Sequence, residues 1–307
     1  MNGPVLRITL VILLLTIAAL LLDMRAAVAL LLQTDWRWVL LCLVVVQLQI
    51  VLSAYRWHIT AVRLGQALSV PRAVREYYLA TLANMSLPGG IVGDAGRVYR
   101  NRQAAGLATA AQSVLLERMA GQIALIVVTT IGCIWWVFGS NHGVFAQGAQ
   151  ILGIVLISSL LIIAVTVLVA SISHTRVSRF IKSFGPAMRQ VWLADRQWLR
   201  QGVLSLLIVV TYLIVFACCA AAVQQPLPAV AVLTIVPLVL LSMVVPLSVG
   251  GWGVREAAAA ALWPLIGLSA EAGLATSVLY GVVCLLGAVP GALWAGLLTE
   301  PANISSE

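Results

Sequence analysis

Charged side chains are scarce in this sequence. Asp, Glu, Lys and Arg make up 9% of its 307 residues, whereas a water-soluble domain carries about 25%. Ten acids and eighteen bases are too few to cover the surface of a soluble protein of this length, and 62% of the residues are hydrophobic. This composition excludes a soluble enzyme, a disordered chain and a disulfide-stabilised scaffold. It predicts an all-α polytopic membrane protein that forms one domain over residues 1–307.

Lysine, histidine and cysteine are also rare, which leaves little material for a metal or redox site. Lys182 is the only lysine beside 17 arginines, and the net charge is +8. The three histidines are isolated, and the five cysteines lie in apolar runs without a CxxC pair. We therefore expect no metal and no cofactor, and we interpret the cysteines as small buried residues. Because no soluble domain is present to carry a basic face, the positive charge predicts cytoplasmic loops and not a nucleic-acid partner.

Long apolar runs predict a transmembrane helical bundle, since about 20 apolar residues cross a bilayer core. Six crossings are expected in three pairs, at residues 5–22 and 38–53, 108–138 and 149–170, and 202–223 and 229–245. One or two further segments at the C-terminal end bring the total to about 7–8 membrane segments. In the last helix, Gly287 and Gly291 form a GxxxG pattern that predicts close helix packing, and Ser269 is placed to cap its start.

The loop at residues 171–201 carries six basic residues against one acid, Asp195. By the positive-inside rule this loop lies in the cytoplasm, as does the N-terminus. Phe184 and Val191 belong to an apolar set at helical spacing, which predicts an amphipathic segment at the membrane surface. We interpret it as a topology anchor, and a specific lipid site is the alternative.

A short apolar segment, residues 77–87, lies among the basic residues of the region 54–103. Tyr77, Thr81 and Asn84 share one helix face there, and Pro88-Gly89-Gly90 ends the helix. Such a short segment is either a re-entrant half-helix or a helix lying in the membrane interface.

Basic and aromatic residues flank the second span. Arg56 is expected to snorkel from its end as a positive-inside anchor. Interfacial anchors are expected at Trp36, Trp38, Tyr55 and Trp57.

The first glycine-rich motif carries four glycines within eight residues: Gly89, Gly90, Gly93 and Gly96. A backbone of this kind bends tightly and presents N–H groups to a ligand. Asp94 and Arg97 follow at the start of a helix, and exposed N–H groups beside Arg97 suit a phosphate. The alternative is a helix-breaking loop with Asp94 as the cap.

Glu117 and Arg118 lie inside a long apolar helix, where ionisable side chains need a partner or an aqueous cavity. If the helix enters the membrane core near Leu107, Glu117 lies about 15 Å deep. Adjacent residues point about 100° apart, so the two charges are expected to have different partners, and Arg97 is a candidate partner for Glu117. The two residues form either a functional site or a buried structural ion pair.

The same chemistry recurs at residues 246–257, where a proline, closely spaced glycines and a charged pair precede a helix. This second motif contains Gly250, Gly251, Gly253, Arg255 and Glu256. Two apolar segments interrupted by glycine and proline in the two halves of a chain are typical of a transporter site built from broken helices. A loop between helices is the alternative. No known catalytic motif accompanies either segment, so we do not expect an enzyme.

The stretch 86–97, Ser-Leu-Pro-Gly-Gly-Ile-Val-Gly-Asp-Ala-Gly-Arg, followed by Glu117-Arg118, resembles the first signature of the lysylphosphatidylglycerol synthase transmembrane (flippase-like) family. Residues 246–257 are similar to its second signature, and Arg56-Trp57 also fits. The resemblance covers nearly the whole chain. The family usually has Gly-Gly-Asp before the arginine, whereas Val92 replaces the first of these glycines here.

The resemblance implies a multi-pass protein of the bacterial inner membrane that binds or moves lipids. Some family members carry a soluble synthase domain that makes an aminoacylated phospholipid. This sequence stops at Glu307 without such a domain, so we expect that it does not make the lipid. The expected partner is a membrane lipid, either a phospholipid, a hopanoid or a lipid-linked sugar, and a separate synthase is a second candidate.

Two functions from different classes are consistent with these residues. In the first, the chain is a lipid flippase whose arginines hold an anionic headgroup in an intramembrane polar cavity while the neighbouring acids orient them. In the second, the chain is a non-transporting scaffold or regulatory subunit of a lipid or envelope-glycan synthesis system, and the charged pairs are structural clamps. The substrate-binding residues of the first hypothesis are Gly89, Gly90, Gly93, Asp94, Arg97, Glu117, Arg118, Gly250, Gly251, Gly253, Arg255 and Glu256.

Overall fold

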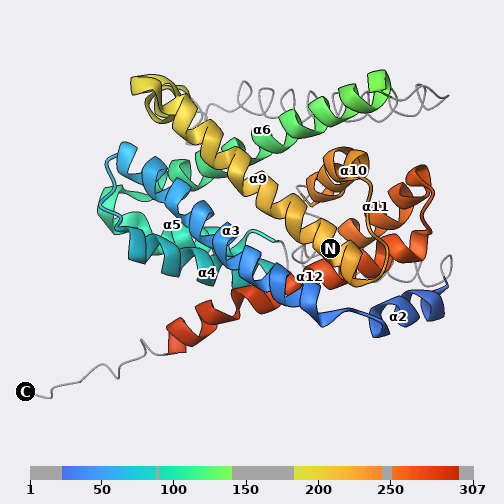
Figure 1. Cartoon of the computed structure of the whole chain (residues 1–307). Coiled ribbons are helices and arrows are strands. Elements are labelled where there is room, and N and C mark those ends of the chain that lie inside the picture. The colour runs from blue at the N-terminus through green and yellow to red at the C-terminus, as the bar shows by residue number, and fades with distance from the viewer. Residues whose placement is uncertain (1–22, 88–89, 140–182, 244–250, 297–307) are drawn as a thin grey trace, which may run out of the picture.

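The computed structural model describes residues 23–87, 90–139, 183–243 and 251–296, and the secondary structure in these ranges is helical (Figure 1). The all-α prediction is confirmed there. Four helices are long and apolar enough to cross a membrane, at Trp36–Arg63, Leu107–Trp136, Ser183–Ala222 and Ala270–Gly291. The spans predicted at residues 5–22 and 149–170 lie outside the described residues. The span predicted at residues 229–245 is a 14-residue apolar helix, Ala229–Ser242, which is shorter than the four membrane-capable helices. The total number of segments therefore stays a prediction.

The described helices are of two lengths. The long ones are α3 (Trp36–Arg63), α6 (Leu107–Gly139), α9 (Gln197–Ala222) and α12 (Ala270–Gly296). The shorter ones are α2 (Met24–Leu32), α4 (Val70–Ser86), α5 (Val92–Ala105), α10 (Ala229–Ser242) and α11 (Val254–Leu262). Irregular helical turns η1 (Arg189–Leu193) and η2 (Ala194–Arg196) precede α9, and η3 (Trp263–Ile266) precedes α12.

Local sequence sets several helix boundaries. Asp35 caps α3 because its side chain accepts a hydrogen bond from the backbone N–H of Arg37 at 2.9 Å. Ser269 caps α12, as predicted, by accepting from the backbone N–H of Ala272 at 3.1 Å. α5 ends at Gly106, whose φ of 83° is accessible to glycine at little cost.

Large apolar side chains form exposed stripes on the long helices. On α6, Leu115, Met119, Ile123, Val127 and Ile131 recur at every fourth residue and are 38% to 60% exposed. This spacing places them on one face of the helix. An apolar stripe of this length is the surface expected against lipid tails.

Glycines of α12 allow neighbouring helices to approach closely. A Cβ atom on Gly287 would collide with Cγ1 of Val46 in α3, and one on Gly291 would lie 2.7 Å from Cβ of Tyr78 in α4. The close packing predicted for the GxxxG pattern is therefore confirmed.

α4 and α5 form an antiparallel hairpin. Gly93, near the start of α5, packs against the backbone of Ala80, and Arg100, near its end, pairs with Glu76. The loop before α4 is hydrogen-bonded to the first turn of α6, so the hairpin opens on the side of the bundle where α3 ends (Figure 1).

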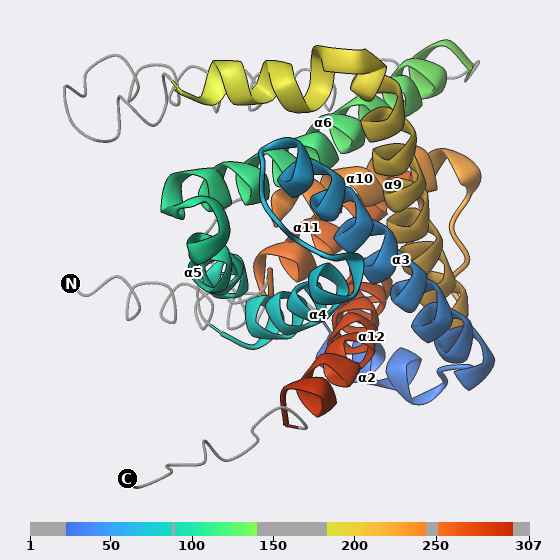
Figure 2. The same ribbon diagram turned by 90° about the vertical axis from the view of Figure 1, so that its left-hand side faces the viewer.

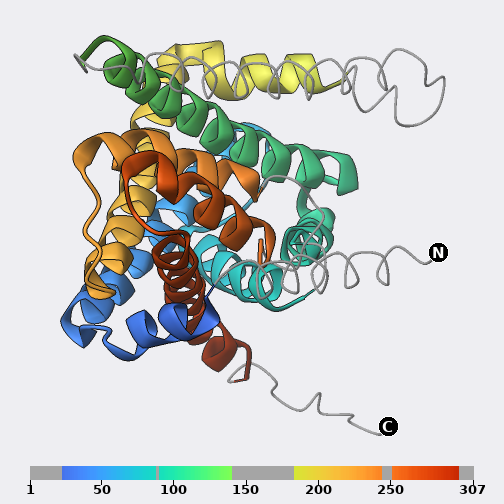
Figure 3. The same cartoon turned by 90° about the vertical axis from the view of Figure 1, so that its right-hand side faces the viewer.

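α10 and α11 form a second hairpin that opens on the opposite side. α10 follows the end of α9, where the carbonyl of Ala222 accepts from the backbone N–H of Asp35 at 2.9 Å. α11 leads through η3 into the start of α12, where Glu271 accepts from the backbone N–H of Asp23 at 3.4 Å. The starts of α5 and α11, which lie within the two glycine-rich motifs, are therefore at the inner ends of two oppositely oriented hairpins (Figure 3).

Residues 183–196 form an arm that turns sharply into α9 (Figure 2). Asp195 and Arg196 adopt left-handed backbone angles, with φ of 53° and 57°, at this turn. Phe184 and Val191 face the bundle and pack against α6. The described part of the predicted amphipathic face therefore packs against protein, and its earlier residues lie outside the described ranges.

Candidate functional site

Five charged side chains from α3, α5 and α6 form one network: Arg56, Asp94, Arg97, Glu117 and Arg118. Nη2 of Arg56 lies 2.6 Å from Oε1 of Glu117, and Oε2 of Glu117 lies 3.6 Å from Nη2 of Arg97. Asp94 pairs with Arg97 through one carboxylate oxygen and with Arg118 through the other. Positive and negative groups therefore alternate from Arg56 to Arg118.

The network confirms two predictions about the charged pair on α6. Glu117 pairs with Arg97, its predicted candidate partner. Arg118 pairs with Asp94 instead, so the adjacent charges do serve different partners.

Burial changes along the network. The side chains of Arg97 and Glu117 are 1% exposed and that of Arg56 is 4% exposed, whereas Arg118 is 43% exposed. Arg118 adjoins Met119 of the apolar stripe on α6. One end of the network is therefore sealed, and the other presents a guanidinium group at the surface of a membrane-capable helix, where a charge is costly unless it has a role.

Two aromatic rings lie against Arg97, and side chains of α4 contact its neighbours. Its guanidinium carbon lies 4.8 Å from the ring centroid of Trp57 and 4.5 Å from that of Tyr77. The hydroxyl of Tyr77 donates to Glu117 at 3.2 Å, and Oδ1 of Asn84 accepts from the backbone N–H of Gly93 at 2.8 Å. The predicted polar stripe of α4 thus faces the site.

Arg97 also has buried donors that the described residues leave without a hydrogen-bond partner, namely Nε and Nη1. Buried polar groups in native proteins are nearly always hydrogen-bonded to protein or water. These two N–H groups therefore mark a position where a water molecule or a ligand oxygen would be stabilised.

The network carries one net positive charge, because three guanidinium groups face two carboxylates. Burial raises the pKa of the Asp94 carboxyl, but the positive charges of Arg97 and Arg118 lower it, and it lies below its usual value. The Asp94 carboxylate is thus ionised at neutral pH, and the net charge of +1 includes it. A largely buried net charge favours an additional anion at the open end.

The charged pair of the second motif is sealed and neutral. Nη2 of Arg255 lies 2.5 Å from Oε1 of Glu256, and its Nε donates to Ser277 at 2.9 Å. Oε2 of Glu256 accepts from the backbone N–H of Gly253 at 2.6 Å, which closes the first turn of α11. Arg255 is 0% exposed and Glu256 is 2% exposed. This pair has the geometry of an internal clamp.

A family model described as lysylphosphatidylglycerol synthase TM region matches residues 5–291, a range that includes both motifs. The chain belongs to this family. Among curated proteins, no significant match to the chain was found. Membership in the family indicates a membrane protein with a lipid-related function.

The sequence gives little indication of the role of Arg56 and Trp57. Arg56 was expected to snorkel, but it is 3% exposed and donates to both Glu117 and Ser205 of α9. Trp57 was expected at the interface, but it is fully buried and donates from Nε1 to Ser113 at 3.2 Å. Both predictions are wrong, because α6 supplies a buried acid and a hydroxyl at this level of α3. Only the resemblance of the Arg56-Trp57 pair to the family pointed to this site.

Among the described residues, the glycines of the motifs allow positive φ angles and close packing between helices. Gly90, Gly251 and Gly253 have φ of 62°, 87° and 85°, which disfavours other residues. A Cβ atom on Gly93 would collide with the backbone of Ala80. Gly89 and Gly250, which belong to the same predicted ligand set, lie outside the described residues.

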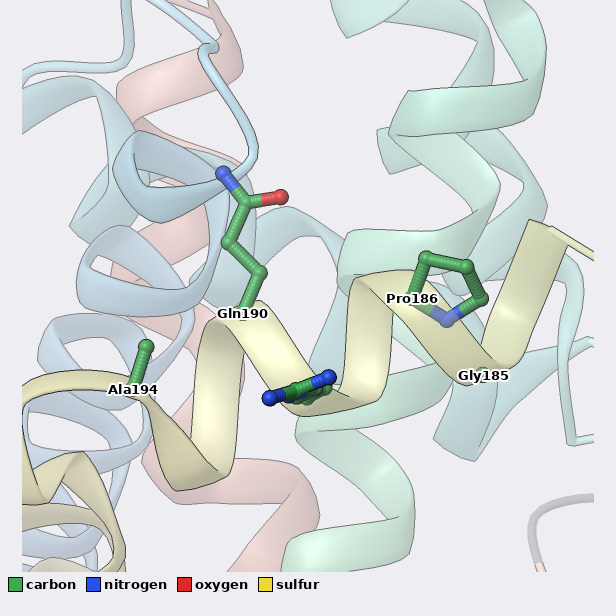
Figure 4. A pocket seen from close by; sticks show the side chains of 5 residues that line it. Gly185, Pro186, Gln190 and Ala194 are labelled. Atoms are coloured by element: carbon green, nitrogen blue, oxygen red, sulfur yellow. The ribbon is translucent and has the colours of Figure 1, made fainter.

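A hollow of about 510 Å³ lies on the arm before α9 (Figure 4). Its lining residues are Gly185, Pro186, Arg189, Gln190 and Ala194. None of them belongs to either motif, so this hollow is separate from the charged network.

Proposed function

We propose that this chain binds an anionic lipid headgroup at the open end of the Arg56–Arg118 network and moves the lipid across the membrane. The observation that carries the proposal is the net charge of +1 on the network, together with the 43% exposure of the Arg118 side chain. A phosphate bound by the exposed guanidinium group of Arg118 would neutralise the excess charge of the network. No catalytic step is part of the proposal.

The lateral position of Arg118 supports a lipid as the ligand. Its guanidinium group lies beside the apolar stripe of α6, so a headgroup could bind while its acyl chains stay along that stripe. Of the substrate classes that the family resemblance implies, a phospholipid or a lipid-linked sugar phosphate supplies the required negative charge, whereas a neutral hopanoid does not.

The two hairpins support movement between leaflets. They open on opposite sides of the bundle, and each places a glycine-rich motif at its inner end. Oppositely oriented elements around a central polar site are the arrangement found in alternating-access transporters. The glycines at 90, 93, 251 and 253 would provide the backbone shapes at the inner ends of these hairpins.

The distribution of basic residues supports an orientation in the bacterial inner membrane. The side on which the α4–α5 hairpin opens carries Arg63, Arg72, Arg75, Arg100, Arg102, Arg189, Arg196 and Arg200. The opposite side carries Arg25 and Arg37, with the acids Asp23, Asp35 and Glu271. By the positive-inside rule the first side faces the cytoplasm. The span predicted from the sequence at residues 5–22 would bring the N-terminus to the same side.

A reconstituted translocation assay tests the proposal. Vesicles that contain the protein and a fluorescent phosphatidylglycerol are treated with an impermeant quencher, and the rate of exchange between leaflets is measured. Arg118→Gln removes one charge-assisted contact worth about 1.5–3 kcal/mol, so we expect the rate to fall by about ten-fold or more. Arg200→Gln makes the same charge change outside the network and should leave the rate within about two-fold. An unchanged rate for Arg118→Gln would remove the proposal.

The sealed Arg255–Glu256 pair favours the second candidate function, a non-transporting scaffold for a separate synthase. In that case the wild-type protein exchanges no lipid in the same vesicles. Added phosphatidylglycerol also leaves its melting temperature in detergent unchanged. A flippase with a headgroup site shows the opposite result in both measurements.

A further inference from the structure

A second basic cluster lies on the α4–α5 hairpin, at its open end and apart from the network of Arg118. Its centre is Glu76, which is 1% exposed and pairs with two arginines. Oε1 of Glu76 lies 3.3 Å from Nη2 of Arg75, and Oε2 lies 2.5 Å from Nε of Arg100. Both carboxylate oxygens are therefore used by guanidinium groups of different helices.

The buried acid holds two accessible cations in place. The side chains of Arg75 and Arg100 are 35% and 41% exposed, although their common partner is buried. A buried carboxylate that fixes two half-exposed guanidinium groups reduces the entropy that they lose on binding an anion. Nε of Arg75 is buried and has no hydrogen-bond partner among the described residues.

A third arginine, Arg72, contacts the backbone of α5 at the same level. Nη2 of Arg72 donates to the backbone carbonyl of Arg100 at 3.3 Å, which carries its guanidinium group across from α4 to α5. The cluster thus contains three positive charges and one negative charge, a net charge of +2. In the described part of the chain, Glu76 is the only carboxylate that pairs with Arg75 or Arg100.

We propose that Arg72, Arg75 and Arg100 form a phosphate site at the rim of the α4–α5 hairpin, with Glu76 as the positioning residue. A phosphomonoester carries a charge of about −1.5 to −2 at neutral pH, which matches the cluster. A phosphodiester carries a single negative charge and matches the inner network better. The rim site is therefore selective for a terminal phosphate group, either on a lipid or on a soluble molecule.

The rim site is physically separate from the inner site but close to it. Arg97 precedes Arg100 by three residues on α5, a rise of about 4.5 Å. Its own contacts are with Asp94 and Glu117 and not with Glu76. The two clusters can therefore be tested by independent variants.

Equilibrium binding to the full-length Arg118→Gln variant in detergent tests the site, because this variant lacks the inner headgroup contact and leaves the rim arginines unchanged. The probes are dioctanoyl phosphatidic acid, dioctanoyl phosphatidylglycerol, dioctanoyl phosphatidylcholine and glycerol phosphate, with the dissociation constant measured by calorimetry. We expect phosphatidic acid to bind more tightly than phosphatidylglycerol, and phosphatidylcholine not to bind. Equal binding of the two anionic lipids, or no binding of either phosphomonoester, overturns the proposal. Glycerol phosphate that binds as well as phosphatidic acid assigns the site to soluble phosphates, and weaker binding assigns it to a lipid.

Variants of the hairpin show where the phosphate binds. Arg100→Gln should weaken phosphatidic acid binding by about ten-fold or more, because a charge-assisted hydrogen bond contributes about 1.5–3 kcal/mol. Arg102→Gln is the matched control on the same helix, since the guanidinium group of Arg102 lies 3.5 Å from the ring centroid of Tyr99 and not on Glu76. The affinity of the Arg102→Gln variant for phosphatidic acid should change by less than about two-fold. Equal weakening by both variants would mean that the overall positive charge of the hairpin attracts the lipid. This result would overturn the proposed site.

A double variant separates binding from folding. Arg100→Gln leaves Glu76 with one partner, so Glu76→Gln with Arg100→Gln removes the unbalanced buried carboxylate as well. The double variant should melt near the wild-type temperature and should still bind phosphatidic acid more weakly than the wild-type protein does. Wild-type affinity in a folded double variant refutes the site. Arg118→Gln should keep rim binding intact, so loss of translocation in that variant tests the inner site alone.

Discussion

Replacing Arg56 and Glu117, singly and together, tests whether the inner network is a coupled unit. These two side chains are 4% and 1% exposed and lie 2.6 Å apart. Removing one partner of a buried ion pair costs about 3–5 kcal/mol, because the other charge is left without compensation. Arg56→Met and Glu117→Met should therefore each lower the melting temperature strongly.

The double variant should be much less damaging than the sum of the two single variants. Two methionines fill the space with apolar atoms and leave no uncompensated charge at these positions. The hydroxyls of Ser205 and Tyr77 each lose a partner, at about 1 kcal/mol apiece. We expect a total cost of about 2–4 kcal/mol for the double variant, against about 6–10 kcal/mol for additive effects.

Thermal unfolding in detergent, followed by circular dichroism, measures the four members of this cycle. A change of 1 kcal/mol shifts the melting temperature by about 2–4 °C in a chain of 150–250 residues, so each single variant should shift it by roughly 6 °C or more. Arg63→Gln with Asp195→Asn forms a control cycle on a pair with a similar distance, 2.6 Å, but with side chains 31% and 71% exposed. Its coupling should stay below about 1 kcal/mol. Additive losses at Arg56 and Glu117 would refute the coupled network.

Two further predictions concern the second motif. Gly281→Ala should destabilise the fold by about 1–3 kcal/mol, because its Cβ would collide with the guanidinium group of Arg255; Gly202→Ala, where nothing lies within 4 Å, should be neutral or slightly stabilising. Equal melting temperatures for the two alanine variants would contradict this packing. Glu256→Gln should cost about 3 kcal/mol or more, since it leaves Arg255 buried without a counter-charge and weakens the cap at Gly253. A melting temperature within about 2 °C of wild type would show that the pair is not a clamp.

The sequence predicted the helical class and the charged pairs because both follow from local rules. Apolar runs predicted α3, α6, α9 and α12, and the 100° step between neighbours predicted separate partners for Glu117 and Arg118. The role of Arg56 was not predictable in this way. Its position at the end of an apolar run is equally compatible with a headgroup contact, and only the packing of α3 against α6 brings it to Glu117.

The short segments also needed tertiary information. Residues 77–87 left a re-entrant helix and an interfacial helix open, because length and polarity are the same in both cases. The structure pairs this segment with α5 as a hairpin through Gly93 and Ala80. Whether the hairpin enters the bilayer is part of the proposed function. Likewise, Phe184 and Val191 have helical spacing whether their face meets lipid or protein.

α12 contacts the two oppositely oriented hairpins and carries glycine at both contacts. Gly291 meets Tyr78 of α4, and Gly273 meets Ala259 of α11. At both points a Cβ atom would overlap the neighbouring helix. The absence of a side chain at positions 273 and 291 therefore sets how near each hairpin lies to α12, and a larger residue at either position would push one hairpin outward and leave the other in place.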